Sequence, residues 1–170
     1  MTNGILDEIL ELAATGLPAA GVRCLLIGGF AVNHYGYTRS TLDVDFMIAA
    51  DQIDPVRSIM RAAGFTNVSV LDNVVFFGKP ETALRVDFLR VDPETLRTLD
   101  ARAVVTLIHG HALRLPALHD LLAMKLFALA QAPERRTDKD LPDVAYLCVL
   151  NNLDLERDIY PLCQRYGSEA

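Results

Sequence analysis

The sequence predicts an α+β fold, in which a mixed β-sheet is flanked by helices and followed by a helical C-terminal part. Helix-like and strand-like segments alternate up to about residue 64 and are followed by a run of strands, whereas the pattern after Pro116 is helical. The chain has 170 residues, enough for one domain with a full core. We therefore expect a single domain over residues 1–170, with a core at about 20–115 and a helical part at about 116–170.

Each element is predicted from the spacing of its apolar residues and from the residues that end it. Helices repeat apolar side chains every three or four residues, half-buried strands repeat them every second residue, and Gly, Pro, Asn and Asp mark the boundaries. In chain order, these rules give a helix at 3–20, a strand at 22–27, a turn at 28–29, a short helix at 30–36, a strand at 41–48 and a helix from 54 to 64.

The remaining elements follow from the same rules. They are strands at 65–71, 73–78 and 82–91, a short helix from 93, a hairpin at 103–115 that folds at His109-Gly110, and helices at 117–131, 140–150 and 154–166. The charged stretch between the first two C-terminal helices, "QAPERRTDKDLP", is expected to be a connector.

Composition excludes several classes of protein. The net charge of -6 argues against a general electrostatic nucleic-acid binder, which needs a basic surface. No segment approaches the roughly 20 apolar residues of a membrane span, and the N-terminus lacks the basic region of a signal peptide. The three cysteines are scattered through apolar segments, as buried thiols in a reducing compartment would be. We expect a cytoplasmic protein with no membrane partner.

Two aspartates interrupt the apolar strand "TLDVDFMI". Asp43 and Asp45 are two residues apart, so they share one face of the strand, and Val44 and Phe46 take the other. Neighbouring carboxylates repel unless a cation lies between them, and Mg²⁺ binds through such carboxylates together with substrate phosphates. The alternative is that both acids line a solvated edge strand.

A third carboxylate favours the metal site. Asp87 lies within the apolar strand "ALRVDFLRV", and it would join Asp43 and Asp45 if the two strands were neighbours. Two-metal sites commonly use bridging carboxylates. Upstream, Gly28-Gly29 would let the backbone approach a phosphate closely, with the N–H groups of the following helix directed at the anion.

These residues together resemble a known superfamily. "GGFAVNHYGYTRSTLDVDFMI" followed by "LRVDFL" resembles the nucleotidyltransferase fold of the polymerase-beta type, whose mark is a glycine pair, then Asp-x-Asp, then a third Asp. "LPALHDLLAMKLFAL" and "RRTDKDLPDVAYL" look like the C-terminal motifs of AbiEii-type and MenT-type nucleotidyltransferases, which include toxins of toxin–antitoxin and abortive-infection systems. The resemblance covers roughly residues 20–150.

The resemblance implies a two-metal reaction centre. Asp43 and Asp45 would hold two Mg²⁺ ions, Asp87 would complete the site and help to activate the attacking hydroxyl, and Gly28 and Gly29 would cradle the phosphates of a nucleoside triphosphate.

The resemblance also implies contacts around the triphosphate. Arg39 and Thr41 would touch phosphate or the groups around it, and Lys125 would reach the triphosphate as a positive point charge. Asp140 and Asp143 would orient that lysine or the acceptor. The alternatives are that Lys125 is an exposed helix residue and that the two acids favour the N-terminal end of a helix dipole.

The implied function is the transfer of a nucleoside monophosphate from an NTP to an acceptor hydroxyl, as the toxin of a toxin–antitoxin or abortive-infection system with an antitoxin partner. The acceptor would be tRNA, a protein or a small molecule. One alternative is an antibiotic nucleotidyltransferase, and another is a non-catalytic nucleotide-binding or interaction module on the same fold. Phe30 departs from the family, because many transferases carry a phosphate-binding hydroxyl there.

Overall fold

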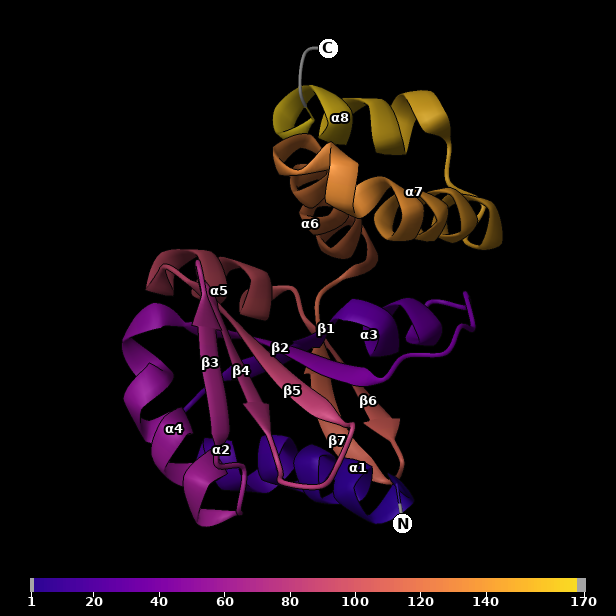
Figure 1. Cartoon of the computed structure of the whole chain (residues 1–170). Helices are drawn as coiled ribbons and strands as arrows, with labels where there is room; N and C mark the ends of the chain where they lie inside the picture. Colours follow the sequence, from indigo (N-terminus) through magenta and orange to yellow (C-terminus); the bar gives the residue numbers. More distant parts are fainter. Residues whose placement is uncertain (1, 168–170) are drawn as a thin grey trace. The chain divides into compact units, whose positions relative to one another are not determined.

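The computed structural model describes residues 2–167, and these residues form two compact units. The N-terminal unit comprises the chain up to Phe30 together with Ser40–Pro116, and the C-terminal unit comprises Ala31–Arg39 and the chain from Ala117 onward. The first is a mixture of strands and helices and the second is helical, so the predicted α+β class is confirmed (Figure 1). The prediction of a single domain stays a prediction.

A five-stranded sheet organises the N-terminal unit, in the spatial order β1-β2-β5-β4-β3. Its strands are β1 (Cys24–Ile27), β2 (Asp43–Ala49), β3 (Asn67–Leu71), β4 (Val74–Gly78) and β5 (Arg85–Val91). Strands β2 and β5 pair in parallel, whereas the other three pairings are antiparallel. The sheet is therefore mixed, as predicted, and the strand with two aspartates lies directly beside the strand with the third.

A cluster of aromatic rings and valines forms an apolar layer on one face of the sheet. The rings of Phe46 on β2 and Phe88 on β5 stack with centroids 5.5 Å apart, and Phe77 on β4 meets Phe88 edge-on at 5.6 Å. Val44 and Val86 are fully buried in the same layer. Because side chains alternate along a strand, this apolar layer directs the acidic residues of β2 and β5 to the opposite face.

Helices and a hairpin complete the N-terminal unit. They are α1 (Thr2–Glu11), a π-helical turn η1 (Leu12–Gly16), α2 (Leu17–Ala19), the start of α3 (Gly28–His34), a short 3₁₀ turn η2 (Ala50–Gln52), α4 (Ile53–Ala62), α5 (Pro93–Ala101), β6 (Val104–Ile108) and β7 (His111–Leu115). Asp92 caps α5 by accepting a hydrogen bond from the Thr95 amide at 2.9 Å. The β6–β7 hairpin folds at His109-Gly110, as predicted, and both residues adopt the positive φ that tight hairpin turns need.

The C-terminal unit consists of α6 (Leu118–Gln131), α7 (Pro133–Leu150), a π-helical turn η3 (Leu155–Ile159) and α8 (Tyr160–Tyr166). The predicted connector over 131–142 is wrong from Pro133 onward, because α7 begins there and continues past residue 142 without a break. Pro133 begins this helix, where its missing N–H costs nothing, and Pro142 is accommodated inside it.

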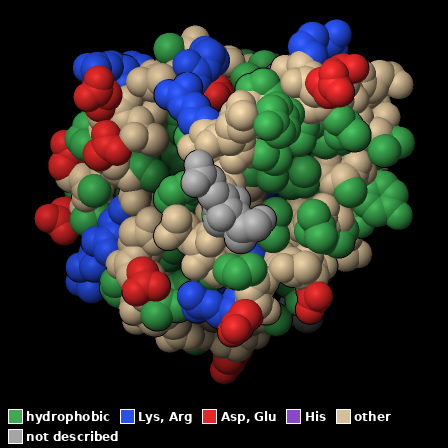
Figure 2. All heavy atoms as spheres, turned by 90° about the horizontal axis from the view of Figure 1, so that it is seen from above, with side chains coloured by type: hydrophobic (Ala, Val, Ile, Leu, Met, Phe, Trp, Pro, Cys, Tyr) green, Lys and Arg blue, Asp and Glu red, His purple; other side chains and the backbone are tan. Residues whose placement is uncertain are grey.

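Large hydrophobic side chains of the C-terminal unit are exposed: Phe127, Leu141, Tyr146, Val149, Leu150, Leu155 and Tyr160. Figure 2 shows hydrophobic side chains gathered on the face that it draws, among scattered acidic and basic residues. Within residues 2–167, no helix has the length and apolar character needed to cross a bilayer.

Candidate active site

The register of β2 and β5 gathers four charged residues on one face of the sheet. Asp43 lies opposite Arg85, and Asp45 lies opposite Asp87. Residues two apart on a strand share a face, so the three aspartates and Arg85 lie together on one face as two neighbouring pairs. We call these four residues the acid face. The neighbouring strands that the sequence argument required are therefore present.

Arg85 binds two of the three carboxylates. Its Nε donates to Oδ1 of Asp87 at 2.6 Å and its Nη2 donates to Oδ2 at 2.7 Å, which is a bidentate pair. The same Nη2 lies 3.3 Å from Oδ2 of Asp43. The hydrogen bonds to Asp87 raise the pKa of Arg85 and outweigh the opposing effect of burial, and the charges of Asp87, Asp43 and Asp45 add to the increase.

The face continues across β4 as an aromatic surface. The guanidinium carbon of Arg85 lies 4.6 Å from the ring centroid of Phe76, which is the register partner of Asp87. A hollow of about 630 Å³ next to it is lined by residues of β3 and β4 and by the segment that leads into β5, including Ser69, Phe76 and Arg85. The acid face therefore borders this hollow at Arg85.

Gly28 is required by its contact with Asp45. Its φ is +62°, and a Cβ built there would overlap the carboxylate of Asp45. At Gly29 a Cβ would lie 2.8 Å from Cβ of Thr41, which is too close for two carbon atoms. The two glycines thus make room for side chains of the next strand and its approach, and both belong to α3 rather than to the predicted turn. Their contact with phosphate stays a prediction.

Thr41 fixes the entry to β2. Its hydroxyl donates to the backbone carbonyl of Asp43 at 3.0 Å. This bond constrains the chain immediately before the first aspartate and leaves the oxygen lone pairs of Thr41 able to accept further hydrogen bonds.

The other predicted site residues form a second charged cluster, within the C-terminal unit. Lys125 on α6 is buried, and its Nζ lies 2.8 Å from Oδ1 of Asp140 and 2.8 Å from Oδ2 of Asp143. Arg39 makes a bidentate pair with Asp143, with N–O distances of 2.8 and 2.9 Å. Lys125 is therefore not the exposed helix residue of the alternative reading. We call Arg39, Lys125, Asp140 and Asp143 the buried cluster.

Hydrogen bonds set the charge state of Asp143. Burial alone would raise its pKa, but hydrogen bonds from Arg39 and Lys125, together with their positive charges, hold the pKa below its ordinary value. Asp140 is less completely paired: among the described residues its Oδ2 has no hydrogen-bond partner, although Nη1 of Arg136 lies 3.5 Å away.

Helix geometry explains why these acids are buried. The buried residues of α7 include Asp140, Asp143, Val144 and Leu147, which follow the three-and-four spacing of a core-facing stripe. Two aspartates occupy positions where apolar residues are usual, and basic side chains from elsewhere in the unit neutralise them.

No group of three or more His, Cys, Asp or Glu side chains within residues 2–167 is arranged to hold a metal ion as it stands. The chemistry of the acid face nevertheless fits Mg²⁺, because it offers carboxylate oxygens from two rigid strands. The guanidinium of Arg85 stands against Asp43 and Asp87 as a cation in its own right. The donor set is thus present, with a protein cation bound to it.

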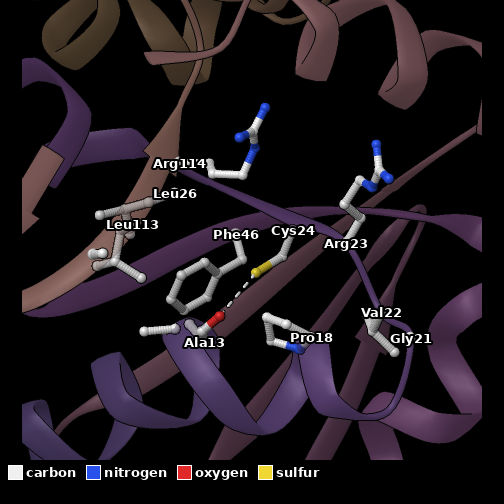
Figure 3. A pocket seen from close by; sticks show the side chains of 12 residues that line it. Ala13, Pro18, Gly21, Val22, Arg23, Cys24, Leu26, Phe46, Leu113 and Arg114 are labelled. Atoms are coloured by element: carbon white, nitrogen blue, oxygen red, sulfur yellow. Dashed lines mark hydrogen bonds between the residues drawn. The ribbon is translucent and has the colours of Figure 1, made fainter. Parts of the chain in front are cut away.

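A separate cavity of about 340 Å³ lies on the other side of the sheet. It is lined mainly by apolar residues of η1, α2, β1 and β7, and also by Phe46 (Figure 3). Because side chains alternate along β2, Phe46 points away from the acid face. Cys24 contacts the carbonyl of Ala13 there at 3.8 Å, and burial raises the pKa of its thiol to about 12, with a smaller contribution from Asp100. The cavity holds none of the predicted site residues.

Comparison with known proteins assigns the family. Residues 12–169 match the family described as "Nucleotidyl transferase AbiEii toxin, Type IV TA system". The chain belongs to the AbiEii family. It is a nucleotidyltransferase, as the motifs of the acid face and of the C-terminal helices predicted. A search of curated proteins gave no match.

Solved structures confirm the fold of this AbiEii-family protein. The antibiotic-resistance factor ANT(2'')-Ia is similar with a TM-score of 0.71 at 15% identity, over 98% of this chain and 92% of that one. An antigenic nucleotidyltransferase-like protein from Paracoccidioides brasiliensis gives 0.60 at 17%, over 94% and 88%. The lincosamide adenylyltransferase LnuA gives 0.57 at 16%, over 85% and 95%. At such identities the likeness concerns the fold.

Sequence reasoning missed one residue of the acid face. Arg85 is two residues before Asp87, so the strand period alone places both side chains on the same face. That spacing was the available signal. Its pairing with Asp43 depends on the register of β2 with β5, which the sequence of this AbiEii-family chain does not show.

Proposed function

We propose that this nucleotidyltransferase depends on a divalent metal and that its reaction centre is the acid face. The observation that carries the proposal is the placement of Asp43, Asp45 and Asp87 on one face of two paired strands. Gly28 supports it, because a larger residue there would overlap the Asp45 carboxylate. Asp43, Asp45 and Asp87 would hold two Mg²⁺ ions.

In the proposed reaction, the oxygen of an acceptor hydroxyl attacks the α-phosphorus of an NTP, the bond from that phosphorus to the β-phosphate oxygen breaks, and pyrophosphate leaves. Bound Mg²⁺ would polarise the phosphoryl oxygens and neutralise developing charge. Asp87 would accept the proton of the attacking hydroxyl. The backbone at Gly28 and Gly29 would lie against the phosphates. Thr41, whose hydroxyl already donates to the Asp43 carbonyl, would hold the backbone around them, and Phe30 offers no hydroxyl.

We also propose that the buried cluster takes part in binding the triphosphate. Lys125 and Arg39 supply two permanent positive charges, and Asp140 and Asp143 hold them in place. For this role, Lys125→Met should raise the KM for NTP by at least about tenfold per folded molecule, since a charge-assisted contact is lost. An unchanged KM would limit the cluster to stabilising the unit.

We propose that this protein is a toxin that transfers a nucleoside monophosphate to a cellular target molecule, and that an antitoxin is its partner. The matching family is described as the toxin of a type IV toxin–antitoxin system. The second candidate function is antibiotic modification. It is favoured by the fold likeness to ANT(2'')-Ia and LnuA, an antibiotic-resistance factor and a lincosamide adenylyltransferase. The net charge of -6 suits a small acceptor better than tRNA.

The test is transfer of label from each of the four NTPs, labelled at the α-phosphate, to tRNA, total cell protein, aminoglycosides and lincosamides in Mg²⁺. We expect one acceptor class to be labelled and Asp43→Asn to reduce the rate at least about 100-fold. Asp51→Asn is the matched control, because Asp51 is exposed on the turn after β2, and it should keep the wild-type rate. Equal transfer by Asp43→Asn and wild type would refute the reaction centre.

A further inference from the structure

We propose that Arg85 is an internal counter-cation of the acid face, which competes with metal ions for the oxygens of Asp43 and Asp87. Metal binding and the Arg85 ion pairs would then exclude each other, so Arg85 would set the metal concentration at which the site fills. The inference rests on the proposed function, since it takes these carboxylates as the metal ligands.

The contacts of Arg85 are those of a bound cation. Both oxygens of Asp87 accept hydrogen bonds from it, at 2.6 and 2.7 Å, and Oδ2 of Asp43 lies 3.3 Å away. The guanidinium therefore bridges one carboxylate from each of the two strands. Mg²⁺ requires direct coordination by such oxygens, and a divalent ion there would repel the positive charge of Arg85.

Because Asp87 is buried, its carboxylate needs a bound cation, either Arg85 or a metal ion. The side chain of Asp87 is only 10% exposed, so water can do little to stabilise its charge when no cation is bound. Arg85 supplies that charge on the same face and within the same strand. Arg85 therefore stabilises the arrangement of the acid face by itself, because it pairs with Asp87 on its own strand and with Asp43 on the neighbouring strand.

The Arg85 side chain is only partly buried. Its side chain is 46% exposed, and its guanidinium lies over the ring of Phe76 at the edge of the hollow between β3, β4 and β5. The side chain therefore borders solvent and an aromatic surface rather than closely packed protein on every side. Stacking of a guanidinium on an aromatic face gives the displaced group a favourable contact.

Strand β5 offers a matched control. Arg90 lies on the same strand, but its Nη2 donates to the backbone carbonyl of Asp72 at 2.9 Å, at the turn between β3 and β4. It makes no ion pair with the acid face among the contacts of the described residues. The substitution Arg90→Gln removes the same charge from the same strand without freeing Asp43 or Asp87.

The decisive experiment is Mn²⁺ binding without nucleotide, followed by electron paramagnetic resonance of the free ion. We expect Arg85→Gln to bind Mn²⁺ roughly tenfold more tightly than wild type, because the competing charge-assisted bonds are gone. Arg90→Gln should bind within about twofold of wild type. Asp45→Asn should bind more weakly in both the wild-type and the Arg85→Gln background, which places the ion on the acid face.

The outcomes separate this inference from the proposed function. If wild type binds Mn²⁺ through Asp45 and Arg85→Gln binds equally or more weakly, the competition is refuted and the metal site stands. If neither protein binds Mn²⁺ without nucleotide, the competition is refuted, and the transfer assay with Asp43→Asn decides the proposed function separately. A second measurement needs no variant: the Nε–H resonance of Arg85 in the wild-type NMR spectrum should move toward that of a solvated arginine as Mg²⁺ is added. An Nε–H signal that stays unchanged while Mg²⁺ binds would also refute the competition.

Discussion

The acid face and the buried cluster use the same chemistry in opposite ways. In the buried cluster, two carboxylates meet two basic side chains, and the side chains of Lys125, Asp140 and Asp143 are all below 10% exposed. On the acid face, one guanidinium pairs with two of the three carboxylates, and Asp43 is 33% exposed. Matched charges in the interior therefore stabilise the fold, whereas an excess of carboxylates at an exposed surface indicates a binding site for cations.

Removing Lys125 should give the largest effect on stability. Lys125→Met leaves Asp140 with only the distant Arg136, and it removes one of the two partners of Asp143. Breaking a buried ion pair from one side costs about 3–5 kcal/mol. Urea unfolding followed by circular dichroism measures this loss, and Lys139→Met, an exposed lysine on α7, is the control that should change little. A loss below about 1 kcal/mol would mean that the cluster does not hold the unit together.

Gly28→Ala should have the next largest effect, on the acid face. The positive φ of +62° is unfavourable for alanine, and its Cβ would push the Asp45 carboxylate aside. We expect a loss of about 2 kcal/mol in unfolding free energy and a strong loss of nucleotide transfer.

Gly21→Ala is the control that separates the two causes. Gly21 has a φ of +76°, and nothing lies within 4 Å of the added Cβ. Its cost should therefore be that of the backbone alone, with transfer retained. If the two variants transferred nucleotide equally well, the contact between Gly28 and Asp45 would have no part in the site.

The pH dependence of stability should give the smallest effect, and it comes from the buried cluster. In the folded protein the pKa of Asp143 is below its ordinary value. Ionised Asp143 therefore stabilises the fold fully at pH values above its ordinary pKa, and this stabilisation is lost as the pH falls toward the folded pKa. Below about pH 4, the unfolding free energy of wild type should fall more steeply than that of Lys125→Met, in which Asp143 has lost one of its cations. Parallel curves for the two proteins would contradict this account.

The sequence predicted most of the N-terminal unit because its signals are local. The alternation of Asp43, Val44, Asp45 and Phe46 specifies a strand with one apolar and one acidic face. The strand that carries Asp87 has the same alternation, and the two strands pair in the fold. Turn residues such as His109-Gly110 mark a hairpin without any tertiary information. The motif resemblance identified the family, which the match over residues 12–169 confirms.

The missed features depend on contacts between distant residues. The start of α7 was predicted as a connector because the stretch is densely charged, and the sequence does not show that pairing with Lys125 makes burial of Asp140 and Asp143 acceptable. The pairing of Arg85 with Asp43 could not be predicted without the strand register. In both cases a charge that looks solvated in the sequence is paired in the fold.

The central claim, that the acid face carries the reaction, is tested most directly by the transfer rate of Asp45→Asn measured beside its stability. We predict a rate at least about 100-fold below wild type with the acceptor that wild type labels. The unfolding free energy should stay within about 1 kcal/mol of wild type, because the substitution removes a charge from a face already rich in carboxylates. A folded Asp45→Asn protein that transfers nucleotide within threefold of the wild-type rate would contradict the claim.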